Sequence, residues 1–315
     1  MSETMKAAVI HQFGDTNQFT IEERPVPIPG DGEVLIEVHA SGVNPIDFKT
    51  RTGQGVSLIW EKINFPVILG WDVSGVVVES KATEFNVGDE VFGMPRFPQL
   101  ADGYAQFVSA PANEIAQKPN NISHVEAAAT PLAALTAWQA LFDTAGLLAD
   151  QSVLIHAGAG GVGHLAIQLA KWKGARVITT TSTHNTAFAS SLGADKVIDY
   201  TITSYWEAVS DVDVVFHMIS PDLRDKSYQT MRKGGHLISI TGPVPPNEPV
   251  AHGVNGEFIS VRPNGGQITA IAELLASGAV KINIDNTYPL AQVAQAHRYL
   301  EDGHTRGKVV LKLQP

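Results

Sequence analysis

The stretch Ser152-Val-Leu-Ile-His-Ala-Gly-Ala-Gly-Gly-Val-Gly163 decides the fold of the middle of this chain. Its apolar run predicts a buried strand, and the apolar spacing over residues 164–173 predicts a helix. Between them lies Gly158-x-Gly160-x-x-Gly163, the pattern of a dinucleotide-binding turn. The first glycine allows a tight turn, the second lets the backbone approach a pyrophosphate, and the third lets the helix pack on the strand. Packing alone can explain such a turn, but the flanking strand and helix favour nucleotide binding.

No Asp or Glu stands between Asp150 and Asp195. In NAD-binding folds an acidic residue about twenty positions after the glycines accepts hydrogen bonds from the ribose hydroxyls. Here the next strand, residues 176–181, is followed by Ser182, Thr183 and His184, which are neutral or weakly basic donors suited to a 2′-phosphate. The sequence therefore favours NADPH over NADH. Ser182 and Thr183 are also expected to cap the helix that follows, which is compatible with binding phosphate.

Composition limits the classes of function. The chain has 315 residues, 44% of them hydrophobic and 17% charged, enough for two packed domains. A net charge of −10 argues against binding nucleic acid or an anionic membrane, so small molecules are the expected partners. The absence of cysteine excludes disulfides, thiolate nucleophiles and Cys-based zinc sites. No signal peptide or long apolar run is visible, and a cytoplasmic location is the default expectation.

The pattern of elements changes along the chain. Short alternating strands separated by Gly, Pro and Asn turns predict a β-rich barrel before about residue 120. Strands and helices then alternate, with strands predicted at residues 153–156, 177–181, 196–199, 212–218 and 236–241. This order predicts a doubly wound parallel sheet of the Rossmann type. Helices at 267–276 and 291–300 and a closing strand at 308–313 follow, and we expect that strand to return to the first domain. The predicted domains are 1–121 with 262–315 and, inserted between these two segments, 122–261.

Eight segments together resemble the medium-chain dehydrogenase/reductase superfamily, in its zinc-independent quinone oxidoreductase or enone reductase branch. In order, they are Ser41-Gly-Val-Asn-Pro-Ile-Asp-Phe-Lys49, Gly70-Trp-Asp-Val-Ser-Gly75, Val87-Gly-Asp-Glu-Val-Phe-Gly93, Gly103-Tyr-Ala-Gln-Phe107, Pro131-Leu-Ala-Ala-Leu-Thr-Ala-Trp138, residues 156–163, Ser191-Leu-Gly-Ala-Asp195 with Val197-Ile-Asp-Tyr200, and His304-Thr-Arg-Gly-Lys-Val-Val310. The resemblance implies an α/β protein with a GroES-like catalytic domain, a Rossmann domain that binds the cofactor, and an active site in the cleft between them.

The resemblance also implies that the catalytic metal has been lost. Zinc-dependent members carry a Cys where Asn44 stands and Gly-His-Glu where Gly70, Trp71 and Asp72 stand. Without a Lewis acid, alcohol oxidation is a poor candidate, whereas reduction of a conjugated double bond or a quinone needs none. Asp72 is expected to organise the backbone of the cleft rather than to act as an acid. We expect no metal site.

Several site residues follow only from the resemblance. Lys49 is expected to be catalytic, donating a hydrogen bond to the substrate oxygen or the cofactor, unless it is simply a solvated loop lysine. Asn44 is expected to contact the nicotinamide ribose or the substrate, or else to form an Asx-turn before Pro45. Thr136 is placed near the nicotinamide, although its hydroxyl could instead bond to the preceding helical turn.

At the adenosine end, Tyr200 resembles a family tyrosine beside the ribose phosphate, and His184 stands where relatives often have Arg, which weakens the preference for NADPH. Lys173 is assigned either to this end or to the helix terminus as a balancing charge. Asn264 belongs to Arg262-Pro-Asn264, which resembles the stretch of the family that approaches the cofactor. The expected cofactor-binding residues are Asn44, Thr136, Gly158, Ala159, Gly160, Gly161, Val162, Thr181, Ser182, Thr183, His184, Tyr200 and Asn264.

The sequence thus predicts an NADPH-dependent oxidoreductase that transfers hydride to a quinone or to the β-carbon of an α,β-unsaturated carbonyl, without zinc. The alternative is an NADPH-binding sensor or interaction protein with little turnover. A homodimer is implied by the resemblance, with an edge strand such as residues 236–240 pairing across a two-fold axis.

Overall fold

A computed structural model describes residues 4–314. The chain divides into two compact units. The first comprises the N-terminal part through Leu135, the segment Arg262–Gly278 and the C-terminal segment from Ile282. The second comprises Thr136–Val261 with Ala279–Lys281. The first unit therefore extends beyond residue 121, where the sequence placed the boundary, because helix α2 (His124–Ala128) packs on strands β3 and β5 of its sheet.

The first unit is built on two sheets. A seven-stranded sheet has the order β15-β16-β3-β5-β6-β8, with β7 also paired to β3, and a smaller sheet has the order β2-β1-β4. The strands are β1 (Thr4–Ile10), β2 (Phe19–Pro25), β3 (Glu33–Val43), β4 (Val67–Ile68), β5 (Val73–Ser80), β6 (Glu90–Gly93), β7 (Phe107–Pro111), β8 (Ile115–Gln117), β15 (Ile284–Pro289) and β16 (Lys308–Lys312). The helices are α1 (Pro45–Arg51), α2, α9 (Gly265–Ala276), α10 (Val293–Glu301) and the start of α3 (Pro131–Trp138).

Strand β16 explains how the C-terminal segment joins the first unit. It lies between β15, to which it is parallel, and β3, to which it is antiparallel, with Val310 opposite Gly42. Its side chains Val309, Val310 and Leu311 are fully buried. The last strand of the chain is therefore an interior strand of the sheet, as we expected for the closing segment.

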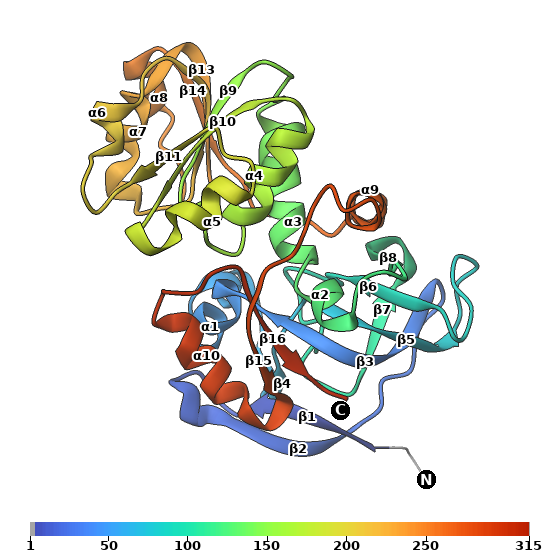
Figure 1. Ribbon diagram of the computed structural model, residues 1–315. Helices are drawn as coiled ribbons and strands as arrows, with labels where there is room; N and C mark the ends of the chain where they lie inside the picture. The colour runs from blue at the N-terminus through green and yellow to red at the C-terminus, as the bar shows by residue number, and fades with distance from the viewer. Residues whose placement is uncertain (1–3, 315) are drawn as a thin grey trace. The chain divides into compact units, whose positions relative to one another are not determined.

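The second unit is a six-stranded parallel sheet with the order β11-β10-β9-β12-β13-β14, the strand order of a dinucleotide-binding fold. The strands are β9 (Ser152–Ile155), β10 (Arg176–Thr181), β11 (Lys196–Asp199), β12 (Val212–His217), β13 (Met231–Ser239) and β14 (Asn255–Phe258). The helices are α4 (Gly163–Trp172), α5 (Thr186–Ser191), α6 (Tyr205–Ala208), α7 (Arg224–Tyr228) and α8 (Asn247–His252), with a π-helical segment at Gln139–Thr144. Figure 1 shows helices on both faces of this sheet, α4 and α5 on one and α7 and α8 on the other.

From β9 the chain continues outward to β10 and β11, whereas from β12 it continues outward in the opposite direction to β13 and β14. The helices that follow β9 and β12 therefore lie on opposite faces of the sheet. Such a reversal of strand order leaves a crevice at the carboxyl ends of the strands, where nucleotides bind. The apolar residues Val153, Leu154 and Ile155 of β9 are fully buried, as expected for a central parallel strand covered on both faces. The predicted doubly wound sheet is confirmed.

One expectation about the sheet is wrong. Residues 236–240 do not form an edge, because β13 is paired with β12 on one side and with β14 on the other. Strand β14 is the edge of the sheet on that side. Its sequence Asn255-Gly-Glu-Phe258 is mostly exposed and has no apolar run, so periodicity does not reveal it.

No helix formed by residues 4–314 is long and apolar enough to cross a membrane.

Candidate functional site

The glycine-rich turn joins β9 to α4, as predicted. Its three glycines have different surroundings. A Cβ on Gly158 would lie 2.0 Å from Thr179 Oγ1, and a Cβ on Gly163 would lie 2.2 Å from the carbonyl oxygen of Ala157. A Cβ on Gly160 would meet only that carbonyl, at 3.3 Å. The protein itself therefore requires glycine at the first and third positions, whereas the second leaves its backbone open to a ligand.

The tight turn before α4 is made by an alanine. Ala157 has a φ of 50°, in the left-handed region, whereas Gly158 has no positive φ. The turn is fixed from β10, because Gly158 N donates to the Thr180 carbonyl at 2.9 Å and Ala157 N donates to Thr180 Oγ1 at 3.2 Å. Gly158 is needed for its close approach to Thr179 rather than for its conformational freedom.

The residues that follow β10 lie at the carboxyl end of the sheet, beside the end of β11. Thr181 is buried, and Thr183 and His184 are exposed. Ser182 occupies the position before a short 3-10 turn, Thr183–Asn185, but its side chain makes no capping bond, and α5 begins only at Thr186. The expectation that Ser182 and Thr183 cap the next helix is therefore wrong. Thr183 instead donates to Asp199 Oδ2 at 2.6 Å.

Asp199 lies among the candidate site residues, although the sequence alone did not single it out. It ends β11, and its Oδ1 accepts hydrogen bonds from Thr201 N at 2.9 Å and Thr201 Oγ1 at 2.7 Å. The hydrogen bond from Thr183 is the main cause that lowers the pKa of Asp199, so the carboxylate is charged. An acidic side chain therefore lies beside the end of β10, contributed by the neighbouring strand.

A cavity of about 420 Å³ opens beside this strand edge. It is lined by Ala157, Thr180, Tyr200, Thr203, Ser204, Tyr205, Trp206, Ile219 and Leu223. The lining includes Ala157 of the glycine-rich turn, Thr180 of β10 and the predicted Tyr200, which is 57% exposed. Aromatic and aliphatic walls of this kind suit the base of a nucleotide. Lys173 does not belong here, because it follows the C-terminal end of α4 and its Nζ lies over the Phe142 ring.

In the first unit, Asn44 is buried in a polar cluster. It precedes α1, and its Nδ2 donates to Asp72 Oδ2 at 2.9 Å. Lys308 Nζ donates to Asn44 Oδ1 and lies 3.5 Å from Asp72 Oδ2. No more than 3% of any of these three residues is exposed. The Asn44 side chain thus makes hydrogen bonds to both other members of this cluster.

Asp72 organises the surrounding backbone. Its Oδ1 accepts from Leu132 N at 2.7 Å, and its carbonyl oxygen accepts from Ser41 Oγ at 2.8 Å and Gly42 N at 3.0 Å. Burial raises the pKa of Asp72, and the Lys308 ammonium opposes that rise. These contacts agree with the organising role expected for Asp72.

A second buried carboxyl, Asp47, lies in the first turn of α1. Its Oδ2 accepts from Asn44 N at 2.6 Å and from Tyr104 OH at 2.9 Å. Burial is the main cause that raises the pKa of Asp47 to about 7. Tyr104 OH lies 3.2 Å from His297 Nε2, and Arg51 Nη1 lies 3.2 Å from His297 Nδ1. Because Arg51 can only donate, the hydrogen bonds run from Arg51 through His297 and Tyr104 to Asp47.

The other predicted residues are divided between the units. Lys49 lies exposed in the last turn of α1, and Asn264 lies exposed at the start of α9, where its Oδ1 accepts from Gln267 N at 2.9 Å. Both belong to the first unit, as does Asn44. Thr136 is buried in α3 and belongs to the second unit, with the glycine-rich turn, residues 181–184 and Tyr200.

Within residues 4–314, no group of three or more His, Cys, Asp and Glu side chains is placed to hold a metal ion.

Lys308 and Asp47 were also missed as site residues. Lys308 has one sequence signal, a charged residue that opens the apolar run Val309-Val-Leu311, where a buried lysine requires a partner. Asp47 has the signal of a capping residue three positions after Asn44. Neither signal identifies which residue the side chain will contact. Residues 44, 72 and 308 come together only through the pairing of β3 with β16 and β5.

Comparisons with known proteins agree with this architecture. Residues 30–120 match the alcohol dehydrogenase GroES-like domain family, and residues 192–311 match the zinc-binding dehydrogenase family. The chain is 34% identical to the tomato (Solanum lycopersicum) 2-methylene-furan-3-one reductase, over 98% of this chain and 79% of the relative. It is also 34% identical to the chloroplastic NADPH-dependent alkenal/one oxidoreductase of Arabidopsis thaliana, over the same shares. The solved quinone oxidoreductase from Coxiella burnetii superposes with a TM-score of 0.90 at 36% identity, covering 99% of this chain and 100% of the other.

A GroES-like unit joined to a Rossmann unit with a glycine-rich turn defines a two-domain, nucleotide-linked oxidoreductase fold. The chain belongs to the medium-chain dehydrogenase/reductase family.

Proposed function

We propose that this chain is an NADPH-dependent reductase that transfers hydride to the β-carbon of an α,β-unsaturated carbonyl or to a quinone, without a metal. The observation that carries the proposal is the glycine-rich turn at the reversal point of the parallel sheet, with Gly160 open to a ligand. The relatives named as an alkenal/one oxidoreductase, a furanone reductase and a quinone oxidoreductase support this reaction class.

The residues of the second unit fit a dinucleotide. Gly158, Ala159, Gly160, Gly161 and Val162 would hold the pyrophosphate at the N-terminus of α4, where the first N–H groups of a helix lack intrahelical partners. Thr181, Ser182, Thr183, His184 and Tyr200 would surround the adenosine ribose, with the adenine in the 420 Å³ cavity. The bound nicotinamide supplies the hydride. Binding of the 2′-phosphate is favoured by the side chains of Ser182, His184 and Tyr200. It is disfavoured by the negative charge of Asp199.

Lys308 supports a mechanism without zinc. Its ammonium bonds to Asn44 and lies beside Asp72, the two positions that the resemblance aligns with metal-binding positions in zinc-dependent relatives. A buried cation there repels a metal cation and balances the Asp72 carboxylate. The positive charge of Lys308 therefore lies where those relatives would hold the positive charge of the metal ion.

The remaining catalytic assignments concern the first unit and α3. Lys49 would donate a hydrogen bond to the substrate oxygen, where negative charge develops as hydride is accepted. Asn44 already uses its Oδ1 and one amide hydrogen, so only its second amide hydrogen would be available for the cofactor. Thr136 and Asn264 would contact the nicotinamide half. These groups bind and orient, and the new enolate takes its proton from solvent.

We also propose a homodimer, formed through β14 instead of residues 236–240. Within the described residues β14 is paired only with β13, and its Phe258 is 43% exposed. An unpaired edge strand is a template for pairing with a second copy. Light scattering of the wild type and of Phe258→Pro tests this, since proline there removes an N–H donor on the unpaired side of β14; an unchanged dimer in the variant would refute β14 pairing.

The first experiment is the initial rate of NADPH and NADH oxidation with a simple α,β-unsaturated ketone and, separately, with a 1,4-quinone. Turnover that prefers NADPH is expected, and the faster acceptor names the substrate class. Nucleotide binding without turnover of either acceptor would instead favour the sensor alternative. Alcohol-dependent reduction of NADP⁺ would contradict the proposal.

A further inference from the structure

Three buried side chains of the second unit converge on the hydroxyl of a fourth buried residue, Ser227. Ser227 Oγ lies 3.1 Å from His156 Nε2, 3.1 Å from His217 Nδ1 and 3.0 Å from Tyr205 OH. All four residues are at most 3% exposed. These contacts join side chains to one another, so they are separate from the backbone hydrogen bonds of the helices and the sheet.

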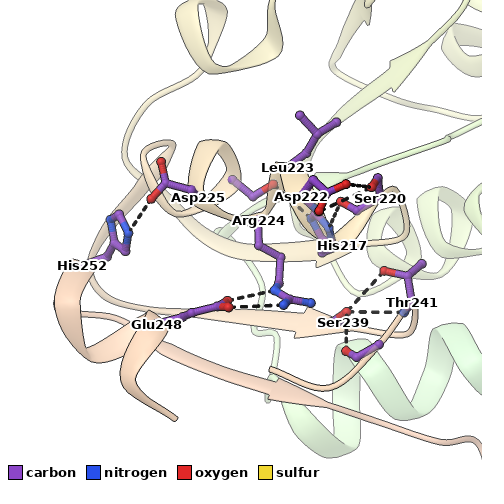
Figure 2. Close-up of polar contacts among 12 residues, drawn as sticks. His217, Ser220, Asp222, Leu223, Arg224, Asp225, Ser239, Thr241, Glu248 and His252 are labelled. Atoms are coloured by element: carbon purple, nitrogen blue, oxygen red, sulfur yellow. Dashed lines mark hydrogen bonds and ion pairs between the residues drawn. The ribbon is translucent and has the colours of Figure 1, made fainter. Parts of the chain in front are cut away.

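The direction of these hydrogen bonds follows from one carbonyl group. His217 Nε2 lies 3.1 Å from the Ser220 carbonyl oxygen, a contact drawn in Figure 2. A carbonyl can only accept, so His217 carries its hydrogen on Nε2. Burial lowers the pKa of His217 to about 4, so the ring is neutral and its Nδ1 is a bare acceptor. Ser227 must therefore donate its single hydrogen to His217.

The remaining directions follow in turn. With its hydrogen committed, Ser227 accepts from His156 Nε2, which places the hydrogen of His156 on that atom. Burial lowers the pKa of His156 to about 3, so its Nδ1 is bare and accepts from Thr180 Oγ1 at 3.3 Å. Thr180 Oγ1 in turn accepts from Ala157 N at 3.2 Å. The chain of donors thus runs from Ala157 through Thr180, His156, Ser227 and His217 to Ser220.

The two ends of this chain lie in the two loops that line the 420 Å³ cavity. Ala157 and Thr180 belong to one wall, and Ser220 lies between the wall residues Ile219 and Leu223. Tyr205, which also lines the cavity, contacts both Ser227 and the Leu223 carbonyl oxygen, the latter at 3.1 Å. Neither Ser227, His156 nor His217 lines the cavity itself.

We infer that Ser227 is a positioning residue for nucleotide binding, which holds the glycine-rich turn and the loop after β12 at a fixed separation through the directed chain from Ala157 to Ser220. The inference rests on the proposed binding of a nucleotide in this cavity. A directed buried polar network fixes the groups it joins, and removal of its central member leaves a buried donor and a buried acceptor without partners. Without the Ser227 hydroxyl, the glycine-rich turn and the loop after β12 are no longer connected by this chain of hydrogen bonds.

The test compares Ser227→Ala with Ser74→Ala. Ser74 is equally buried, in the first unit, where its Oγ donates to the Val91 carbonyl oxygen and contacts His124 Nδ1. Both variants lose a buried hydroxyl, so both are expected to lose thermal stability. Only Ser227→Ala is expected to weaken NADPH binding, roughly tenfold by titration calorimetry, with KM for NADPH raised equally and kcat at saturating NADPH unchanged.

Equal NADPH affinity in the wild type and Ser227→Ala would overturn the inference while leaving the proposed function intact. Failure of the wild type to bind NADPH or NADH would overturn the proposed function first. A second measurement needs no variant to fold: nitrogen-15 NMR of the wild-type imidazoles is expected to show His156 and His217 both neutral and both protonated on Nε2. A hydrogen on Nδ1 of either ring would overturn the directed chain.

Discussion

Lys308 Nζ lies 3.5 Å from Asp72 Oδ2, and both side chains are almost completely buried. Removing one member of such a pair leaves a buried charge without its partner. We expect Lys308→Met to lower the free energy of unfolding by about 3–5 kcal/mol. Asp72→Asn combined with Lys308→Met is expected to recover part of that loss, which urea denaturation of the two single variants and the double variant measures.

Lys171→Met is the matched control for Lys308→Met. Lys171 pairs with Asp195 at 2.9 Å, but the two side chains are 33% and 40% exposed. Its loss should cost less than about 1 kcal/mol. Similar losses for the exposed and buried lysines would contradict the view that the Lys308 pair is held in a dry interior.

Asp47 makes the stability of the protein depend on pH. Burial raises its pKa from 3.8 to about 7, so between these values the folded chain holds a proton that the unfolded chain has released. The stability contributed by this proton is complete below about pH 4 and is lost as the pH rises toward 7. Asp47→Asn removes the titration, so the variant is expected to gain stability relative to the wild type across that interval. A difference that stays constant in denaturant titrations across this interval would contradict the assignment.

Substitutions of two of the glycines should separate effects on folding from effects on binding. Gly163→Ala places a Cβ against the Ala157 carbonyl oxygen and is expected to cost about 1–3 kcal/mol of stability. Gly160→Ala meets that oxygen only at 3.3 Å, so its melting temperature should change little. Its NADPH affinity should nevertheless fall about tenfold or more, since the methyl group stands where the pyrophosphate approaches. If Gly160→Ala binds NADPH normally, the phosphates do not lie at this turn.

Asp199 should influence the choice of cofactor. Its carboxylate accepts from Thr183 at 2.6 Å, beside the residues proposed to bind the 2′-phosphate. Asp199→Asn removes a charge that repels the phosphate, and we expect the ratio of kcat/KM for NADPH over NADH to rise severalfold. Asp195→Asn is the control, because it removes a carboxylate that lies before β11, at the other end of the strand. Equal shifts in the two variants would indicate a general effect of net charge.

Lys49 provides a test of the chemical step. Lys49→Met keeps an unbranched side chain, one heavy atom shorter, but removes its donor, and kcat should fall about tenfold to a hundredfold if the donor stabilises the developing oxyanion. Lys49→Arg retains a donor and should recover part of the rate. An unchanged kcat in Lys49→Met would mean that this lysine is only solvated and takes no part in the chemical step.

The sequence predicts the second unit well because its information is local. The apolar runs of β9, β10 and β12 are buried in the sheet, and the glycine spacing between β9 and α4 can be read within one short segment. The family and the two-part α/β architecture are confirmed. Strand β14 escaped prediction because it has no apolar run to mark it.

The buried polar groups were not predictable in the same way. Asn44 was singled out from the sequence, but its partners Asp72 and Lys308 lie far away along the chain and meet only when β3, β5 and β16 pair. Asp199 was overlooked for the same reason: the search for an acid followed the chain beyond β10, whereas parallel pairing places the end of β11 beside it. Spacing along the chain reveals neighbours on one element and conceals those that a sheet brings together.

The interior position of β16 has a consequence for biosynthesis. The second unit is complete once residue 281 has left the ribosome, and its contiguous strands can fold while the remainder is still being made. The first unit begins earlier but lacks β16, and with it the Lys308 ammonium, until residues 308–312 emerge. Until then Asp72 has no countercharge from Lys308, so the unit whose synthesis begins first is completed after the other.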